Sequence, residues 1–264
     1  MRRSVTVFRG AKGFGWYNKY QKEGAEAFTK YVPPTPFNWE SPSPLNENMS
    51  SATRPKVYMD ISIEKEPIGR LVIECAIDIT PKTVENFINL IQSKAILPCV
   101  SDDGQPTTKT AGYKNTLFHS IHKDNAIMCG DIVNNDGSGN FSPFGPVYTN
   151  RFFEDENFII PHSSRGLLSM VSTKRHSNGS QFYISLNEQG SRHMNGKCVV
   201  FARIPLTCNI LDAAEEGKEG AESVYSADIL RENEKVLHEC EKVFSFRGKP
   251  AKPITIENCG ILEQ

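Results

Sequence analysis

Three short motifs between residues 152 and 183 decide the fold of this chain. Residues 152–158 read FFEDENF, residues 166–170 read GLLSM and residues 178–183 read NGSQFY. The second and third motifs are predicted strands, and all three consist largely of packing and turn residues. Other segments can therefore be placed by their order and spacing relative to this stretch.

In this order and at this spacing, the three motifs resemble those of the cyclophilins, which are peptidyl-prolyl cis-trans isomerases. The resemblance covers roughly residues 55–262. It implies a mainly β fold, an eight-stranded antiparallel cyclophilin-like barrel capped by two helices. Two departures are an extended N-terminal arm and an enlarged C-terminal helix region. We therefore expect a basic and aromatic arm at residues 1–54 and a cyclophilin-type domain at residues 55–264.

The residues ahead of the motifs predict a hairpin and a helix. Residues 57–63 alternate apolar and polar, which indicates a half-buried strand. Residues 66–69 are the predicted turn, and residues 70–75 are the returning strand. Thr80 followed by Pro81 predicts a helix start. The helix that follows has a core-facing stripe at i, i+3, i+4 and i+7: Val84, Phe87, Ile88 and Ile91.

Two segments are longer than in the simplest cyclophilins. Residues 93–112 are expected to form an extended loop without regular structure, because the segment contains three breakers: Pro98, Gly104 and Pro106. The helix region near the C-terminus is expected to start at residues 209–214. Apolar spacing between residues 229 and 244 then predicts a long amphipathic helix. Residues 253–260 resemble the closing strand of the family.

The catalytic arginine of the family is replaced in this sequence. In cyclophilins that arginine directly follows a Phe-His pair and directs a hydrogen bond at the prolyl amide as it twists. Here the pair is Phe118-His119, and the next residue is Ser120. A serine hydroxyl is short and uncharged, and it cannot reach where a guanidinium reaches. Because such a donor stabilises the transition state, we expect very low isomerase turnover.

Other groove positions of the family are also changed. Without gaps, its pocket phenylalanine and methionine correspond to Asn125 and Ala126, and its groove glutamine corresponds to Met128. A gap would match Met128 with the methionine instead, but would delete the glutamine. Further along, Gln181 is retained, and the substituted positions are Val171, Ser172, Tyr183, His193, Met194 and Cys198. Cyclosporin-like ligands hydrogen-bond the arginine, glutamine and tryptophan positions of the family, so we expect them to bind weakly or not at all.

The overall composition indicates a globular protein in a reducing compartment. The net charge is −1, and no apolar run approaches the length of a membrane span. The seven cysteines are scattered and form no C-x-x-C pair, which is typical of reduced thiols. We therefore expect a cytoplasmic or cytoskeleton-associated protein. His119 and His122 are three residues apart without a second ligand pair, so we expect no metal and no cofactor.

The N-terminal arm differs in composition from the rest of the chain. Six basic residues and no acidic residue occur up to Lys22, and Arg2 and Arg3 are the first of them. This charge pattern is typical of a mitochondrial presequence, but three glycines between residues 10 and 15 interrupt an amphipathic helix. The aromatic residues that we expect to make contacts are Trp16, Tyr17, Phe37 and Trp39.

Two interpretations of the arm remain open at this point. It is either a strap on the barrel or a free tail, or it is a segment that becomes ordered on a partner with an acidic surface. RNA, a tubulin-like surface and another protein fit the composition equally well.

Three functions are compatible with the sequence. The favoured one is a weak or inactive isomerase that acts as a binding or structural component of an assembly through its arm. The alternatives are an active prolyl isomerase with unusual groove chemistry and a domain that binds proline peptides without turning them over. The discriminating residue is Ser120.

Overall fold

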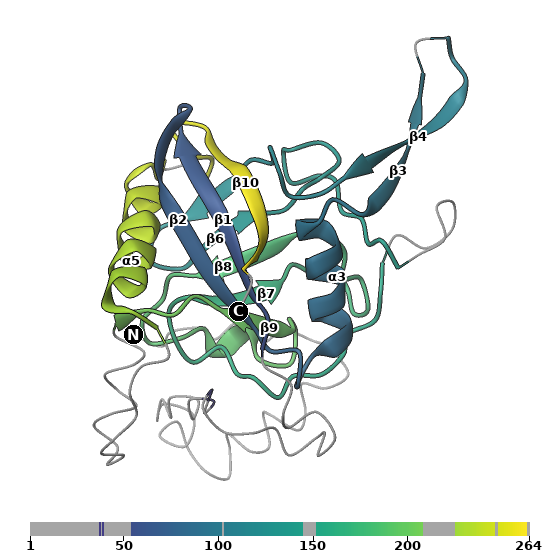
Figure 1. Ribbon diagram of the computed structural model, residues 1–264. Helices are drawn as coiled ribbons and strands as arrows, with labels where there is room; N and C mark the ends of the chain where they lie inside the picture. The colour runs from purple at the N-terminus through teal and green to yellow at the C-terminus, as the bar shows by residue number, and fades with distance from the viewer. Residues whose placement is uncertain are drawn as a thin grey trace, which may run out of the picture. The chain divides into compact units, whose positions relative to one another are not determined.

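The structure is a computed structural model that describes residues 37, 39, 54–101, 103–144, 152–207, 225–245 and 248–262. These residues lie in one compact unit, Pro34–Gln264. The main element is an eight-stranded antiparallel sheet with the strand order β10-β1-β2-β9-β7-β8-β6-β5 (Figure 1). The predicted mainly β fold with eight antiparallel strands and two helices is confirmed.

The described part of the chain contains strands, two α-helices and one short 3-10 helix. From the N-terminus they are β1 (Lys56–Ile63), β2 (Glu66–Cys75), α3 (Pro81–Ile91), β3 (Ala95–Val100), β4 (Pro106–Ala111), β5 (Ser120–His122), β6 (Ala126–Cys129), β7 (Leu167–Met170), β8 (Phe182–Ser185), the 3-10 helix η2 (Arg192–Met194), β9 (Val200–Arg203), α5 (Ala227–Lys242) and β10 (Ile254–Leu262).

The two ends of the sheet approach each other. On one side β10 pairs with β1 along its whole length. On its other side β10 bonds to the segment that leads into β5, since the Phe118 amide donates to the Ile254 carbonyl at 3.0 Å and the Ile256 amide donates to Thr116 at 3.0 Å. The sheet therefore curls around a core in which Phe87 of α3 packs against the rings of Tyr113, Phe182 and Phe201.

The motif at residues 152–158 holds the first helix in place. The carboxylate of Glu156 accepts hydrogen bonds from the amides of Lys82 and Thr83, at 3.0 and 2.9 Å. These amides belong to the first turn of α3, where backbone donors have no partner within the helix. We expected Thr80 to cap the helix, but its hydroxyl donates to the Ala76 carbonyl instead, and Glu156 takes the capping role.

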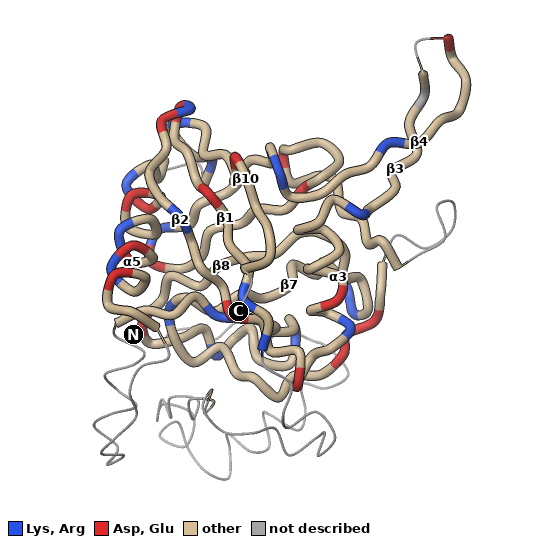
Figure 2. Tube along the Cα trace, viewed as in Figure 1, with Lys and Arg blue, Asp and Glu red and all other residues tan. Residues whose placement is uncertain are grey.

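The enlarged C-terminal region contributes α5, which lies against β2 (Figure 1). Ser226 caps it by accepting from the Ile229 amide, and Val236, Leu237 and Cys240 are buried. The charged residues of α5 are spread along the helix (Figure 2). The predicted amphipathic helix is confirmed, whereas the predicted start at residues 209–214 lies outside the described residues.

The turn of the first hairpin lies earlier than the sequence pattern indicated. Glu64 and Lys65 form it, with φ of 53° and 72°, and β2 already begins at Glu66. Positive φ at both central residues is the geometry that matches the twist of a two-residue hairpin. Pro67 and Gly69 therefore lie within β2, where a register irregularity opposite Ile61 and Ser62 accommodates them.

The prediction that residues 93–112 lack regular structure was wrong. They contain β3 and β4, which pair in an antiparallel hairpin from Ala95–Ala111 to Val100–Pro106. Pro98 and Pro106 are compatible with this pairing because each is at a position whose amide would point away from the partner strand. The hairpin is a separate two-stranded sheet that extends away from the main sheet (Figure 1).

Candidate functional site

One face of the main sheet brings together several of the predicted groove positions. In the strand register, Ser120 lies opposite Met128, and Met128 lies opposite Tyr183. Residues directly opposite each other in antiparallel strands point to the same face. Side chains of β5, β6 and β8 that are far apart in the sequence therefore form one continuous surface.

The centre of this surface is an apolar cluster, which we call the groove cluster. Its buried members are Ala126, Tyr183 and Cys198, and its half-buried members are Met128, Val171 and Met194. All six are positions that the family resemblance assigned to the groove. Its three half-buried members leave a partly exposed apolar surface at this position.

Ser120 has a polar partner that the sequence analysis did not identify. Its hydroxyl oxygen lies 3.1 Å from Nε2 of His122. The two residues are separated by one position on β5, so both point to the groove face. Ser120 is half-buried and His122 is exposed. The available signal is the spacing S-x-H on a short strand, which places both side chains on one face.

Behind the groove cluster lies a buried histidine. The ring of His162 stacks on the ring of Tyr183 at 5.9 Å with an interplanar angle of 13°. Its Nδ1 lies 3.0 Å from Asn195 Oδ1, and its Nε2 lies 3.0 Å from the Ser169 hydroxyl. Burial lowers the pKa of His162 to about 4, so the ring is neutral at pH 7. Burial also raises the pKa of Tyr183.

The retained glutamine of the family holds a loop rather than an open surface. The amide nitrogen of the Gln181 side chain donates to the carbonyls of Gly137 and Gly139, and Gln181 is buried. Ser172 is also occupied within its own loop, since its hydroxyl bonds to the Lys174 carbonyl and lies 2.9 Å from that of Ser177. Neither side chain replaces the missing arginine.

The glycine-rich loop that Gln181 holds is organised around the buried carboxylate of Asp131. This carboxylate accepts hydrogen bonds from five backbone amides: Val133, Asn134, Asp136, Gly137 and Gly139. Burial alone would raise the pKa of Asp131, but these bonds outweigh it and lower the pKa. The amides of the loop therefore point at the protein's own carboxylate and not at an external anion.

The remaining predicted groove positions contribute little to the cluster. Asn125 and His193 are exposed, Asn125 on the turn between β5 and β6 and His193 in η2.

A cavity of about 650 Å³ lies elsewhere, between α5 and the loop that follows β8. Its lining residues include Leu186, Asn187, Leu206 and His238. None of the predicted groove positions lines this cavity.

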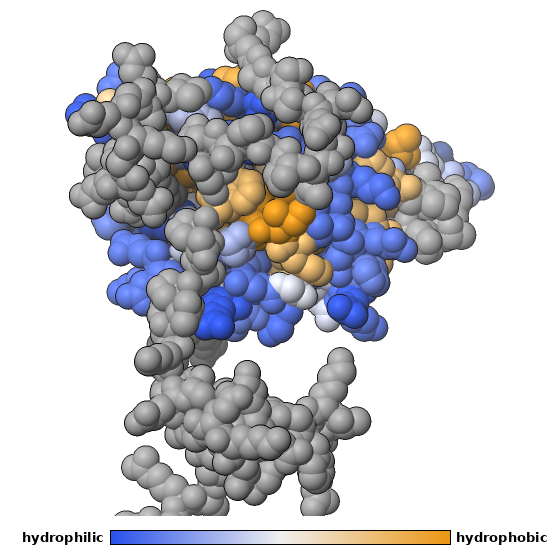
Figure 3. Space-filling model, turned by 90° about the horizontal axis from the view of Figure 1, so that it is seen from below, coloured by the Kyte–Doolittle hydropathy of each residue, from blue (hydrophilic) through white to orange (hydrophobic). Residues whose placement is uncertain are grey.

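The structure describes two of the predicted arm residues. Phe37 and Trp39 are half-buried, in edge-to-face contact at 5.5 Å. They pack against an apolar cluster on the barrel, the anchor cluster, formed by Ala76, Ile79, Ile160, Leu167 and Val200. Apolar side chains also gather on the face of the molecule seen in Figure 3. Arg2, Arg3, Trp16 and Tyr17 lie outside the described residues.

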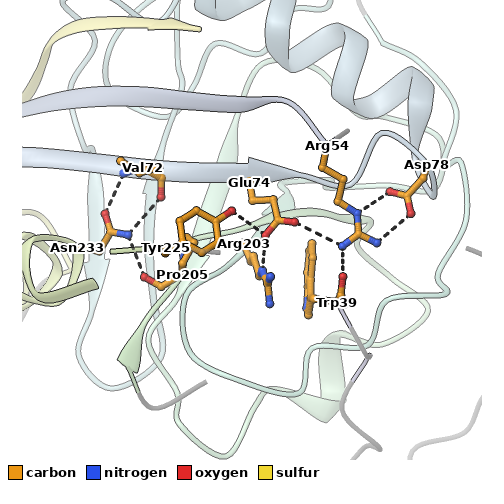
Figure 4. Close-up of polar contacts among 9 residues, drawn as sticks. All are labelled: Trp39, Arg54, Val72, Glu74, Asp78, Arg203, Pro205, Tyr225 and Asn233. Atoms are coloured by element: carbon orange, nitrogen blue, oxygen red, sulfur yellow. Dashed lines mark hydrogen bonds and ion pairs between the residues drawn. The ribbon is translucent and has the colours of Figure 1, made fainter. Parts of the chain in front are cut away.

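Charged residues fix Trp39 beside the anchor cluster (Figure 4). Arg54 donates to the Trp39 carbonyl and forms a two-pronged ion pair with Asp78, at 2.8 and 2.9 Å. The guanidinium groups of Arg54 and Arg203 lie 5.4 and 4.9 Å from the centroid of the Trp39 ring. The end of the arm is therefore held by cation–π contacts as well as by apolar packing.

The buried carboxylate of Glu74 connects this network to the C-terminal region (Figure 4). It accepts from Nε of Arg203 at 2.7 Å and from the hydroxyl of Tyr225 at 3.0 Å, and it lies 3.5 Å from Arg54. Asn233 of α5 bonds to both the amide and the carbonyl of Val72. The N-terminal arm and the enlarged C-terminal helix region therefore both contact β2.

Within the described part of the chain, no three His, Cys, Asp or Glu side chains are placed to hold a metal ion. Among the same residues, no helix has the length and apolar character that crossing a membrane requires.

Comparison with known proteins gives relatives of two kinds. Human "Probable inactive peptidyl-prolyl cis-trans isomerase-like 6" is 38% identical over 185 residues, which are 70% of this chain and 51% of that protein. Human "NK-tumor recognition protein" is 35% identical over 181 residues, which are 69% of this chain and 12% of that protein. The chain thus spans about half the length of the first relative and about an eighth of the length of the second.

A shorter relative is covered over most of its length. "Peptidyl-prolyl cis-trans isomerase H" of Rhizopus delemar is 38% identical over 160 residues, which are 61% of this chain and 82% of that protein. Residues 58–261 match the family described as "Cyclophilin type peptidyl-prolyl cis-trans isomerase/CLD". With the curled eight-stranded sheet and the groove face on β5, β6 and β8, these matches show that the chain belongs to the cyclophilin-type peptidyl-prolyl cis-trans isomerase family.

Proposed function

We propose that this chain is a cyclophilin-type binding module with little isomerase turnover, which serves as a component of a protein assembly. The observation that carries the first part is Ser120 at the position of the catalytic arginine. This position supplies a short hydroxyl, bonded to His122, in place of a guanidinium. Loss of one such donor commonly lowers the rate by about 10²–10³. The name of the human relative, which includes "Probable inactive", is in line with this.

The groove cluster supports binding without turnover. Its six apolar side chains remain together although the residues that polarise the amide have been replaced. Seating a proline ring requires only a suitable apolar surface, whereas twisting the amide requires stabilisation of a charge that appears in the transition state. The module therefore binds proline-containing segments weakly and releases them unchanged.

The N-terminal arm supports the assembly role. Phe37 and Trp39 attach the end of the arm to the barrel. Those residues are rich in basic and aromatic side chains, which suits them to an acidic protein surface. We place this assembly in the cytoplasm or on the cytoskeleton, because the described cysteines are free thiols.

A protease-coupled assay on a proline tetrapeptide tests the catalytic part. We expect the wild-type chain to be at least about a hundredfold slower than an active cyclophilin. The variant Ser120→Arg measures how much of the deficit is due to that one position, and Ser120→Ala is its matched control. Wild-type activity within about tenfold of an active cyclophilin would contradict the proposal.

A truncation tests the assembly part. The informative variant lacks residues 1–36 and retains Phe37 and Trp39, because removing residues 1–54 would also remove Arg54 from its ion pair with Asp78. We expect the truncated protein to keep its melting temperature and to lose the proteins that co-purify with the full chain from its native cells. Unchanged co-purification would show that the arm is not the attachment site.

A further inference from the structure

The hairpin of β3 and β4 has an edge that no other strand of the described part covers. It forms a two-stranded sheet of its own and extends away from the main sheet (Figure 1). A two-stranded hairpin is at best marginally stable in water, and additional strands stabilise it. This hairpin also carries few charges, which are the usual protection of an exposed strand edge (Figure 2).

The strand register shows which backbone groups of β4 point outward. Pro98 pairs with Thr108, and Val100 pairs with Pro106. A proline has no amide hydrogen, so these pairs fit the positions that do not exchange hydrogen bonds within the hairpin. Because the pattern alternates, the amide and carbonyl of Thr108 and Thr110 face away from β3.

The two edges of the hairpin are not equivalent. On the β3 side, the outward amide at the centre is missing because Pro98 occupies that position. On the β4 side, every residue from Pro106 to Thr110 is exposed, and both outward threonines have amide hydrogens. Threonine also has a high preference for strands. The β4 edge lacks its outward amide only at the strand end, at Pro106, whereas the β3 edge lacks it at the centre, so the β4 edge is the better one for a further strand.

We propose that β4 pairs with β4 of a second copy of this chain, antiparallel, with Thr108 opposite Thr108. In this register each Thr108 donates to and accepts from the other, and each Thr110 amide donates to the Pro106 carbonyl of the other copy. Pro106 has no amide hydrogen to donate, but its carbonyl still accepts a hydrogen bond from the Thr110 amide of the other copy. The only charged residue of β4, Lys109, then lies opposite Thr107 of the other copy.

A neighbouring register is less favourable. A shift by one position places Lys109 directly opposite Lys109, and like charges at opposite positions are destabilising. In the Thr108 register no two charged residues of β4 lie opposite each other, and this charge pattern makes a second copy the fitting occupant.

Analytical ultracentrifugation of the full chain over a wide concentration range tests the proposal. We expect a reversible dimer for the wild-type protein. The variant Thr108→Pro removes the outward amide and should be monomeric, whereas Thr108→Val keeps the amide and should still dimerise. Thr107→Glu places a carboxylate opposite Lys109 of the other copy and should tighten the dimer about threefold or more.

Two results would overturn the proposal. One is a wild-type chain that is monomeric at all accessible concentrations, and the other is a Thr108→Pro variant that dimerises like wild type, which would place the dimer contact elsewhere. Amide exchange at Leu97 and Thr107 reports whether the hairpin itself survives in Thr108→Pro. Should it not survive, the pair Thr107→Glu and Thr107→Lys decides: the first must tighten and the second must weaken the dimer.

Discussion

The guanidinium group of Arg203 lies over the indole ring of Trp39, 4.9 Å from its centroid. Arg203 ends β9, whereas Trp39 belongs to the arm that precedes the barrel. Arg203 is itself held by Glu74, and Glu74 also accepts from Tyr225 in the C-terminal region. A single carboxylate on β2 thus connects the arm, the barrel and the segment before α5.

Replacing Trp39 by alanine should destabilise the barrel. The variant loses apolar packing on the anchor cluster and the cation–π contacts with two arginines. We expect a loss of about 2 kcal/mol in the free energy of unfolding, or roughly 4–8 °C in melting temperature. Thermal unfolding followed by circular dichroism measures it. Trp16→Ala is the control and should leave the melting temperature unchanged; equal effects would mean that the contacts at Trp39 are not what stabilises the barrel.

Replacing Glu74 by glutamine should have a larger effect. The amide keeps the shape of the side chain but removes the charge that balances Arg203 and Arg54 in a nearly dry environment. Breaking a buried ion pair on one side commonly costs about 3 kcal/mol or more. Urea denaturation measures the change. Tyr225→Phe removes one hydrogen bond to the same carboxylate and should cost about 1 kcal/mol. A Glu74→Gln variant as stable as Tyr225→Phe would argue against the network.

His162 should make the stability of the fold depend on pH. Its pKa is about 4 in the folded state and 6.5 as the ordinary value. The unfolded chain therefore binds the proton more readily, and stability is lost as the pH falls from about 6.5 to about 4, by about 3 kcal/mol in total.

The variant His162→Gln isolates this contribution. Glutamine does not titrate, so the difference in unfolding free energy between wild type and variant should shrink as the pH falls through that range. Urea denaturation at about pH 7 and about pH 4.5 brackets most of this window and provides both values. A difference that stays constant between the two pH values would show that His162 is not protonated on unfolding.

Cyclosporin-like ligands should bind weakly or not at all. The family positions to which they hydrogen-bond are here Ser120 and His193, and Met128 has taken the place of the groove glutamine in the ungapped alignment. His193 is exposed and outside the groove cluster. Isothermal titration calorimetry with cyclosporin checks this expectation. Submicromolar affinity would mean that the assignment of groove positions is incorrect.

The fold class followed from the resemblance of the motifs to the cyclophilins. Periodicity indicated the two strands of the first hairpin and both helices, although the turn lies at Glu64 and Lys65, earlier than predicted. It failed in the segment of residues 93–112. Proline breaks a strand only where its amide would be needed, and the orientation of the amide depends on the pairing register, which a single strand does not reveal.

The sequence predicted which residues lie at the groove but not which of their side chains contact one another. Six of the predicted residues meet in the groove cluster, and Ser120 lies on the same face. The partner of Ser120 could not be derived, because a contact between side chains depends on their rotamers as well as on their spacing. The same holds for His162, which lies seven residues from Ser169 along the chain and meets Tyr183 only through folding.

The sequence by itself determined the family and the loss of the catalytic arginine, because these properties are carried by residue identity and spacing. Only the tertiary structure decided that Glu156 caps α3, that Trp39 is held between Arg54 and Arg203, and that no other strand of the described part pairs with the outer edge of β4. The first two depend on residues that are distant in sequence and become neighbours in the folded domain, and the third depends on the pairing register of β3 and β4. The free energy of such contacts depends on burial and geometry, which the order of residues does not contain.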